Sequence, residues 1–322
     1  MDEVFFRGLG LPDPKYNLKA GSGTHAEETA NMLIGIERIL KEESPDLVLL
    51  QGDTNTVLAG SLAASKLHIP VGHVEAGLRS FDRNMPEELN RIVADHLSDY
   101  LFAPTTNARK NLLKEGIRNS SVYVTGNTIV DVIKQNMALI DGAKITHITN
   151  SRPYILCTLH REENVDNPQR LHSILQGLEL LYSKLGIDII YPMHPRTKSR
   201  LSQNNYSLPR GLRTTDPLDY ITFLKLEQQA LLILTDSGGV QEEACILKVP
   251  CVTIRENTER PETLQVGANV IAGTAPSRIL SKVRLMLKVQ RSWPNPFGDG
   301  TAAKRIINIL EKKAKRSHLF AD

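Results

Sequence analysis

The sequence has few cysteines, almost no net charge and no long apolar stretch. Each of its three cysteines lies within an apolar run, and no pair has the spacing of a metal finger or a redox motif. We therefore expect Cys157, Cys245 and Cys251 to be small buried side chains in a reducing compartment. Lys and Arg number 39 against 36 Asp and Glu, giving a formal net charge of +3. Nucleic-acid-binding proteins need a larger basic excess, so no nucleic-acid partner is expected.

Signals for membrane insertion or secretion are also missing. Apolar runs such as DLVLLQG and QALLILTD end after a few residues, whereas a helix that spans a membrane needs about 20. Asp and Glu stand near the start of the chain, where a signal peptide would have a basic region followed by an apolar one. We expect a cytoplasmic protein without a membrane segment.

Motifs for common cofactors do not occur. The sequence has no Walker motif, no Gly-x-Gly-x-x-Gly after a first strand, and no His, Cys or Asp cluster with metal-ligand spacing. Neither NAD nor a metal nor any other cofactor is therefore expected.

Short apolar runs alternate with amphipathic helical segments along the chain, a pattern typical of parallel βαβ units. At about 150 residues per domain, the length allows two domains. The alternation weakens before residue 153, which places the predicted boundary near Asn150, with an N-terminal domain of residues 1–150 and a C-terminal domain of residues 151–322. The predicted fold class is α/β, with two Rossmann-like doubly wound domains facing a cleft.

Each predicted domain has its own series of strands. In the first, a helix is expected over residues 25–45, followed by DLVLLQGD as a fully buried strand. Three more strands are predicted at VGHVEA, YLFAPT and VYVTGN, and four in the second domain at YILCTLH, IDIIYPMH, ALLILTDS and PCVTI. KITHITNSRP suits a linker, and the two final helices are expected to pack back on the first domain.

Polar residues that directly follow the strands are the candidates for chemistry, because ligands of such folds bind at the carboxyl ends of strands. Asp53 follows DLVLLQG, although it could simply cap the next helix. Glu87 and Glu88 suit a first helical turn on electrostatic grounds alone, and Arg91 lies in the same helix. Glu75, which follows a short strand, has no such structural explanation.

The second domain contributes basic residues at two strand ends. His160 and Arg161 follow one strand, and His194 and Arg196 follow the next. A lone histidine is usually structural, but a histidine beside an arginine at a cleft edge suits acid–base chemistry next to an anion.

The most specific motif is TDSGGVQEEA. A strand ends there, two glycines let the backbone approach a ligand, and a helix begins with exposed N–H groups that can hold a diphosphate. Ser237 offers a hydroxyl, Gly238 and Gly239 the close approach, and Glu243 a carboxylate one turn later. A simple glycine-containing turn between strand and helix is the alternative.

Six motifs together resemble the non-hydrolysing UDP-N-acetylglucosamine 2-epimerase family: QGDTNTV, HVEAGLRS, MPEELNR, LHREEN, TDSGGVQEEA and NTERPET. The resemblance runs from about Met1 to the final helix. It implies a glycosyltransferase-B-like architecture, a homodimer, a role in polysaccharide biosynthesis and reversible inversion at carbon 2 of the sugar. UDP would be eliminated across carbons 1 and 2 to give 2-acetamidoglucal and then added back, which interconverts UDP-N-acetylglucosamine and UDP-N-acetylmannosamine.

The resemblance also implies roles for single residues. The expected acid–base groups are Asp53, Glu75, Glu87 and His160, supported by Arg91. The expected diphosphate and ribose pocket consists of Ser237, Gly238, Gly239 and Glu243, with Arg260 nearby. Bacterial members bind a second UDP-N-acetylglucosamine as an activator, and Arg161 and His194 fall at similar positions.

The sequence departs from the family at its start. Members begin with a buried strand and a Gly-Thr-Arg-Pro-Glu loop, which this sequence lacks. We therefore expect a first domain with unpaired apolar strand edges and little epimerase activity from the chain as given.

Three other functions fit the same pattern. A glycosyltransferase of the same architecture would also bind a nucleotide sugar. A hydrolysing epimerase would release UDP and the free sugar, and a truncated, inactive paralogue would bind nucleotide without turnover. The carboxylates Asp53, Glu75 and Glu87 favour the non-hydrolysing epimerase over the transferase.

Overall fold

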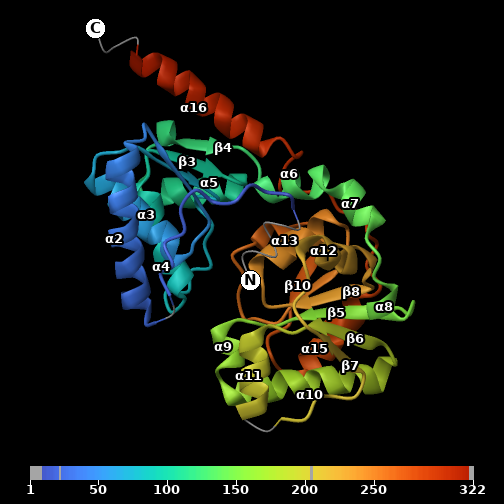
Figure 1. The fold of residues 1–322 in the computed structure, drawn as a ribbon. Coiled ribbons are helices and arrows are strands. Elements are labelled where there is room, and N and C mark those ends of the chain that lie inside the picture. Colours follow the sequence, from blue (N-terminus) through green and yellow to red (C-terminus); the bar gives the residue numbers. More distant parts are fainter. Residues whose placement is uncertain (1–8, 22, 204–205, 319–322) are drawn as a thin grey trace. The chain divides into compact units, whose positions relative to one another are not determined.

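The computed structural model describes residues 9–21, 23–203 and 206–318, which divide into two compact units (Figure 1). Unit 1 comprises Ile133–Pro296 and the described residues up to Asp13, and unit 2 comprises Pro14–Val132 and the described residues from Phe297 onward. Each unit is built on a parallel sheet with helices, so the predicted α/β class is confirmed. The division falls inside α6 (Thr128–Gln135), earlier than the predicted boundary near Asn150.

The segment before residue 153 belongs to unit 1 because its apolar side chains are buried there. It contains two short helices, α7 (Met137–Gly142) and α8 (Thr146–Thr149). Ile145 and Ile148, three positions apart, lie on one side of the chain and enter a core cluster of unit 1. The polar residues around them suggested a linker, which is wrong because these two isoleucines anchor the segment.

The described residues of unit 2 form four parallel strands in chain order, β1-β2-β3-β4. Successive crossovers therefore run in one direction, as in one half of a doubly wound sheet. The strands are β1 (Val48–Gln51), β2 (Val71–Val74), β3 (Tyr100–Ala103) and β4 (Val122–Val124). The helices, besides α6, are α2 (His25–Glu43), α3 (Asn55–Lys66), α4 (Pro86–Leu97), α5 (Thr106–Lys114), the 3-10 turn η1 (Asn119–Ser121) and α16 (Ala302–His318).

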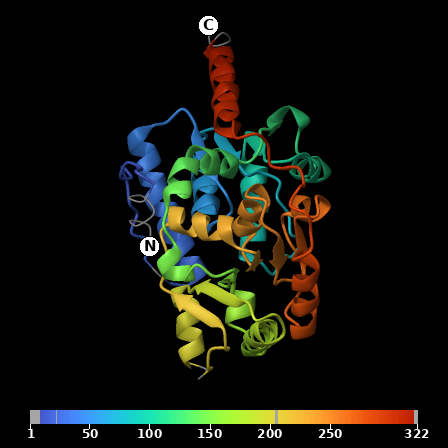
Figure 2. The ribbon, with the colours of Figure 1, turned by 90° about the vertical axis from the view of Figure 1, so that its right-hand side faces the viewer.

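The strand register assigns the helices of unit 2 to faces of its sheet. Val74 and Phe102 are paired in register, and both pack against Ile306 of α16. The neighbouring residues of β3, Leu101 and Ala103, point to the opposite face and pack against α5. Helices α2 and α3 pack against that same face at β1 and β2. Figures 1 and 2 show α16 extending with its C-terminal half beyond the sheet.

Strand β1 is not the fully buried strand that the sequence predicted. Within the described residues only β2 pairs with it, so it forms an edge of the sheet. Leu49 lies opposite Gly72, on the face where α16 covers Phe102, and remains 43% exposed. An apolar run indicates a strand but does not show whether both of its faces are covered.

In unit 1, the part of the chain that the structure describes forms six parallel strands in the order β10-β9-β8-β5-β6-β7. The crossovers therefore run outward in both directions from β5 and β8. Four of these strands were predicted, and β7 and β10 were not. The strands are β5 (Tyr154–Thr158), β6 (Asp188–Pro192), β7 (Leu212–Thr215), β8 (Leu232–Thr235), β9 (Cys251–Thr253) and β10 (Asn269–Ile271). The remaining helices are α9 (Glu162–Val165), α10 (Pro168–Leu185), α11 (Pro195–Gln203), α12 (Tyr220–Gln229), α13 (Gly238–Ile246), α14 (Pro261–Gln265) and α15 (Pro276–Met286).

The core of unit 1 lies on both faces of its sheet. Ile155 and Cys157 of β5 enter the cluster that includes side chains of α10 and α15, whereas Leu156 enters the cluster with α12 and α13. All three cysteines are buried without a disulfide, as predicted. Helix α15 packs against α10 within unit 1, whereas α16 belongs to unit 2 and packs against the sheet of that unit.

Candidate functional site

Asp53 lies just beyond the carboxyl end of β1, and its carboxylate is ion-paired. Nη2 of Arg91 lies 2.5 Å from Oδ2 of Asp53, while Nη1 of Arg91 binds Glu88 at 2.6 Å. The carbonyl oxygen of Asp53 accepts a hydrogen bond from Asn90 at 3.0 Å. The N-cap of α3 is Thr54, so Asp53 does not cap this helix. Its side chain is 29% exposed, which leaves one face open to a ligand.

Glu75 follows β2 with its backbone in the left-handed region, at φ +71°. This conformation is uncommon for residues other than glycine, and such residues cluster at functional sites. Nε2 of Gln51 donates a hydrogen bond to Oε1 of Glu75 at 3.1 Å, and the side chain is half-buried. The backbone therefore directs this carboxylate at the expense of local strain.

The neighbouring glutamates at the start of α4 have different environments. Glu88 is buried and accepts hydrogen bonds from the backbone N–H groups of Ser80 and Phe81, both at 2.9 Å, besides its ion pair with Arg91. It therefore holds the loop before α4. Glu87 is only half-buried, so it is the one of the two whose carboxylate can meet a ligand.

Three predicted carboxylates gather at one edge of unit 2. Gln51 and Val74 are paired in register, so the segments that carry Asp53 and Glu75 leave the sheet side by side. Arg91 ties α4 to Asp53, and Glu87 lies four residues before Arg91 on the same helical face.

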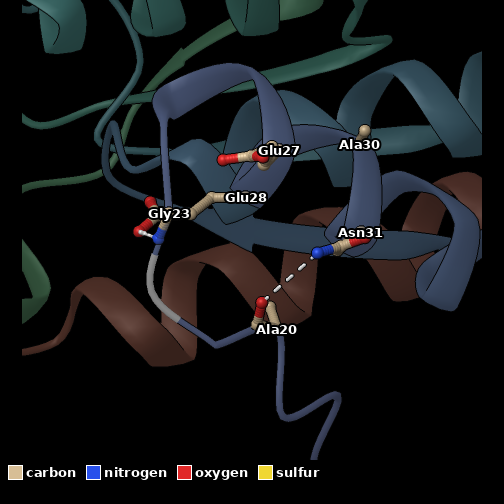
Figure 3. A pocket seen from close by; sticks show the side chains of 6 residues that line it. All are labelled: Ala20, Gly23, Glu27, Glu28, Ala30 and Asn31. Carbon is tan, nitrogen blue, oxygen red and sulfur yellow. Dashed lines mark hydrogen bonds between the residues drawn. The ribbon is translucent and has the colours of Figure 1, made fainter.

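A pocket of about 440 Å³ lies at the N-terminus of α2 (Figure 3). Glu28, which lines it, accepts a hydrogen bond from Asn55, and Asn55 accepts one from Asn90, the partner of the Asp53 carbonyl. A series of hydrogen bonds thus connects this pocket to the Asp53 loop. The sequence analysis had predicted none of the pocket residues as site residues. The lining consists of Ala20, Gly23, Glu27, Glu28, Ala30 and Asn31.

In unit 1, His160 follows β5 and lies over the fully buried Asp236, which follows β8. Asp236 accepts hydrogen bonds from the backbone N–H groups of His160 and Arg161, both at 3.1 Å, and from Nδ2 of Asn164 at 3.1 Å. Nδ1 of His160 lies 3.4 Å from the same carboxylate. The imidazole is 42% exposed, so its other nitrogen is accessible to a ligand.

The structure brings His194 close to His160. Their ring centroids are 6.3 Å apart. Partial burial, followed by the nearby His160 and Arg196, lowers the pKa of His194, and its Nδ1 accepts a hydrogen bond from the backbone N–H of Arg196 at 3.2 Å. A neutral ring then carries its proton on Nε2. Arg161 forms an ion pair with Glu259 at 3.3 Å.

The N-terminus of α13 presents an open glycine. Ser237 is the N-cap, and its hydroxyl accepts a hydrogen bond from the N–H of Val240. A Cβ on Gly238 would lie 2.4 Å from Oε1 of Glu259, whereas a Cβ on Gly239 would meet no atom within 4 Å. Gly238 is therefore required by packing inside the protein, and Gly239 borders open space at a helix N-terminus, which favours anions.

Glu243 belongs to a buried group of acids. Oη of Tyr220 donates a hydrogen bond to Oε1 of Glu243 at 2.8 Å. Glu227, two helical turns after Tyr220, is fully buried, and neither of its carboxylate oxygens has a hydrogen-bond partner among the described residues. Burial, and then the neighbouring Glu243, raise the pKa of Glu227, and burial also raises that of Glu243. Both carboxyl groups therefore favour the protonated form more than exposed glutamates do.

The arginines after β9 form ion pairs inside unit 1. Arg255 is fully buried and binds Glu259 at 2.7 Å, and Nε of Arg260 lies 2.6 Å from Oε1 of Glu242. The resemblance placed Arg260 near the expected diphosphate pocket, and the structure shows its guanidinium paired with Glu242 inside unit 1. Nη1 of Arg260 lies 3.9 Å from Oε1 of Glu259, the same oxygen that lies directly under Gly238.

In the described parts of the chain, no three His, Cys, Asp or Glu side chains are grouped so that they could hold a metal ion. No helix there is long and apolar enough to cross a membrane.

Comparison with known proteins gives the family. The profile of the family described as UDP-N-acetylglucosamine 2-epimerase matches residues 1–311. The chain belongs to the UDP-N-acetylglucosamine 2-epimerase family. A member from Methanocaldococcus jannaschii, named UDP-N-acetylglucosamine 2-epimerase, is 53% identical over 96% of this chain and 87% of its own length. A Pseudomonas aeruginosa relative, named UDP-2,3-diacetamido-2,3-dideoxy-D-glucuronate 2-epimerase, is 42% identical over 97% of this chain and 88% of its own length.

A solved structure of this epimerase family also matches the fold. The M. jannaschii UDP-GlcNAc 2-epimerase, in complex with UDP-GlcNAc and UDP, has a TM-score of 0.93 and 53% identity, covering 97% of this chain and 88% of that one. The fold class implied by the resemblance is thereby confirmed, as is the family.

Sequence reasoning missed the residues of this epimerase-family chain that hold the candidates in place. Asp236 was present in the motif TDSGGVQEEA and follows a strand, which could have singled it out. Asn90 and Asn164 lie in the motifs MPEELNR and LHREEN, but neither directly follows a strand, and each acts through a partner distant in sequence. Glu227 lies in a helix where nothing in the sequence indicates its burial.

Proposed function

We propose that this protein interconverts UDP-N-acetylglucosamine and UDP-N-acetylmannosamine. Family membership at 53% identity to the M. jannaschii enzyme carries this proposal, and the open helix terminus and gathered carboxylates support it. The P. aeruginosa relative acts on another acetamido sugar, as its name states, but it is less similar, at 42%. The acetylglucosamine substrate is therefore favoured.

Unit 1 binds the UDP part in this proposal. The diphosphate accepts hydrogen bonds from the N-terminus of α13 at Ser237 and Gly239, where a side chain would otherwise obstruct it. The ribose hydroxyls donate to Glu243, which Tyr220 holds in place. Arg260 acts indirectly, because its ion pair with Glu242 fixes the wall behind Gly238.

Unit 2 supplies acids and bases for the sugar. A carboxylate among Asp53, Glu75 and Glu87 removes the hydrogen on carbon 2 as a proton, and the C–H electron pair forms the double bond to carbon 1 as the bond to UDP breaks. In the reverse step UDP adds to carbon 1 of 2-acetamidoglucal while a proton reaches the other face of carbon 2. Arg91 orients Asp53 through their ion pair, and His160 of unit 1 exchanges a proton with the leaving or returning phosphate.

Three further properties stay proposals. Activation by a second nucleotide sugar at Arg161 and His194 is supported by the 6.3 Å separation of the rings of His194 and His160. A homodimer and a cytoplasmic location rest on the resemblance and on the sequence alone.

The test is to incubate the protein with UDP-N-acetylglucosamine, without NAD or added metal, and to identify the products by NMR. UDP-N-acetylmannosamine is the expected product, formed at the low rate that the sequence predicted for the chain as given. Free UDP with N-acetylmannosamine would indicate the hydrolysing epimerase instead. Transfer of the sugar to an added acceptor with net inversion or retention at carbon 1 would indicate a glycosyltransferase. UDP binding by calorimetry without any turnover would indicate an inactive paralogue.

A further inference from the structure

A buried histidine lies beneath the Asp53 loop in unit 2. His73, in β2, is fully buried and points to the same face of the sheet as Leu101, the face that α5 covers. Its Nδ1 lies 2.7 Å from Oδ1 of Asp95 in α4, and its Nε2 lies 2.8 Å from the carbonyl oxygen of Gly52. Both ring nitrogens thus have an oxygen partner.

The two partners together fix the protonation state of the ring. A backbone carbonyl can only accept, so Nε2 of His73 carries a proton. Asp95 is also an acceptor, because it takes hydrogen bonds from the N–H of Gly77 at 3.1 Å and lies 2.7 Å from Nη1 of Arg79. Nδ1 therefore carries a proton as well, and His73 is an imidazolium.

The surrounding charges agree with a buried cation at this position. Arg79 continues the chain of ion pairs from Asp95 to Glu115, with contacts of 2.7 and 2.6 Å. Although burial opposes the charged ring, Asp95, Gly52 and the nearby Glu75 raise the pKa of His73, and the imidazolium lowers that of Asp95. The group alternates in sign from His73 to Glu115.

Gly52 is held to β2 at both ends. Its N–H donates to the carbonyl of Val74 at 3.2 Å, and its carbonyl accepts from His73. The carbonyl of Gly52 and the N–H of Asp53 belong to the same peptide group. By binding this carbonyl, His73 fixes the orientation of the peptide plane that leads into Asp53. Gly52 has φ +83°, a conformation that few other residues would adopt without strain.

We propose that His73 is a positioning residue, whose protonated ring orients Asp53 for proton transfer by holding the carbonyl of Gly52. This inference rests on the proposed function of Asp53. His73 does not touch the substrate in this arrangement, and its effect passes through one peptide group. A misplacement of about 1 Å at the reacting group can cost about 100-fold in rate.

The experiment compares two amides at the same position. His73→Gln can place an N–H where Nε2 lies and so retain the bond to Gly52, whereas His73→Asn can place one only near Nδ1, toward Asp95. His73→Gln is expected to keep kcat within about 5-fold of the wild type, and His73→Asn to lower it by about 100-fold with KM changed less than 3-fold. Asp216→Asn, which changes an exposed side chain of unit 1, controls for differences in expression and purification between variants.

NMR tests the protonation of His73 and its effect on Asp53 without the need for turnover. In the wild type, both ring nitrogens of His73 should carry protons at pH 7, and the carboxyl carbon of Asp53 should shift in His73→Asn but not in His73→Gln. A neutral His73 ring, or equal effects of the two amides in kinetics and in the Asp53 signal, would overturn the proposal. If the wild type shows no epimerisation, the proposed function fails, whereas the NMR comparison still tests the positioning.

Discussion

Oδ1 of Asp236 lies 3.1 Å from the backbone N–H of His160 and 3.4 Å from its Nδ1 atom. The carboxylate is fully buried, and it holds the end of β5 against the end of β8. The position of the imidazole in unit 1 therefore depends on an acidic residue 76 positions later in the chain.

Replacement of this acid should affect both stability and turnover. Asp236→Asn turns one acceptor into an NH2 group that faces N–H donors, so we expect a loss of about 1–3 kcal/mol in the free energy of unfolding. It also removes the charge beside His160, so kcat should fall by more than the folded fraction does. Denaturant titration and kinetics at a fixed folded concentration measure the two effects. An unchanged kcat per folded molecule would mean that Asp236 is structural only.

The carboxylates of unit 2 should be needed for rate and not for folding. Asp53→Asn and Glu75→Gln are nearly isosteric, and each should lower kcat by about 100-fold or more, as expected for a positioned acid or base. The melting temperature should change by only a few degrees, because both side chains are partly open to solvent. Glu42→Gln, at an exposed position of α2 in the same unit, is the matched control. A sharp fall in melting temperature with turnover per folded molecule retained would make these carboxylates structural.

The two glycines at α13 should respond differently to alanine. In Gly238→Ala the new Cβ would press on Glu259, whose carboxylate is buried against Arg255, so this variant should lose stability by about 1–3 kcal/mol. In Gly239→Ala the Cβ meets nothing, so the fold should keep its stability while UDP affinity falls by about 10-fold or more. Calorimetry with UDP and thermal denaturation separate the two effects. Normal UDP affinity of Gly239→Ala would contradict the diphosphate site.

Glu227 should make stability depend on pH. Its pKa in the folded protein is raised above the ordinary value of 4.5. The folded state therefore binds an extra proton, and its stability decreases as pH rises from about the ordinary value through the raised one. Glu227→Gln removes this dependence, so the variant should melt several degrees above the wild type at pH 8 and close to it at pH 4. If the stability of both proteins depended on pH in the same way, ionisation of Glu227 would cost little free energy of unfolding, which would contradict this prediction.

The sequence predicted the elements with strong apolar patterns and the polar residues that follow them. Helix α2 begins at His25 as expected, since Thr24 and Glu27 form a capping box. Strands β7 and β10 were missed because LRTT is mostly polar and NVI is short and begins with the polar Asn269. Such short strands are specified by their neighbours in the sheet and not by their own periodicity.

The sequence also predicted only part of the candidate site. Asp53, Glu75, Glu87 and His160 were identified because strand ends and motifs mark them. The groups that orient them were not, since the His73–Asp95 and His160–Asp236 contacts join residues 22 and 76 positions apart. Only packing shows that Glu88 is buried while Glu87 is half-buried.

The exchange of hydrogen at carbon 2 tests the proposed mechanism most directly. The protein is incubated with UDP-N-acetylglucosamine in deuterated water, without NAD or added metal, and the nucleotide sugars are analysed by proton NMR and mass spectrometry. Because a carboxylate removes the carbon 2 hydrogen as a proton and solvent returns it, the account predicts UDP-N-acetylmannosamine with deuterium at carbon 2. UDP-N-acetylmannosamine that retains the original hydrogen at carbon 2 would contradict it.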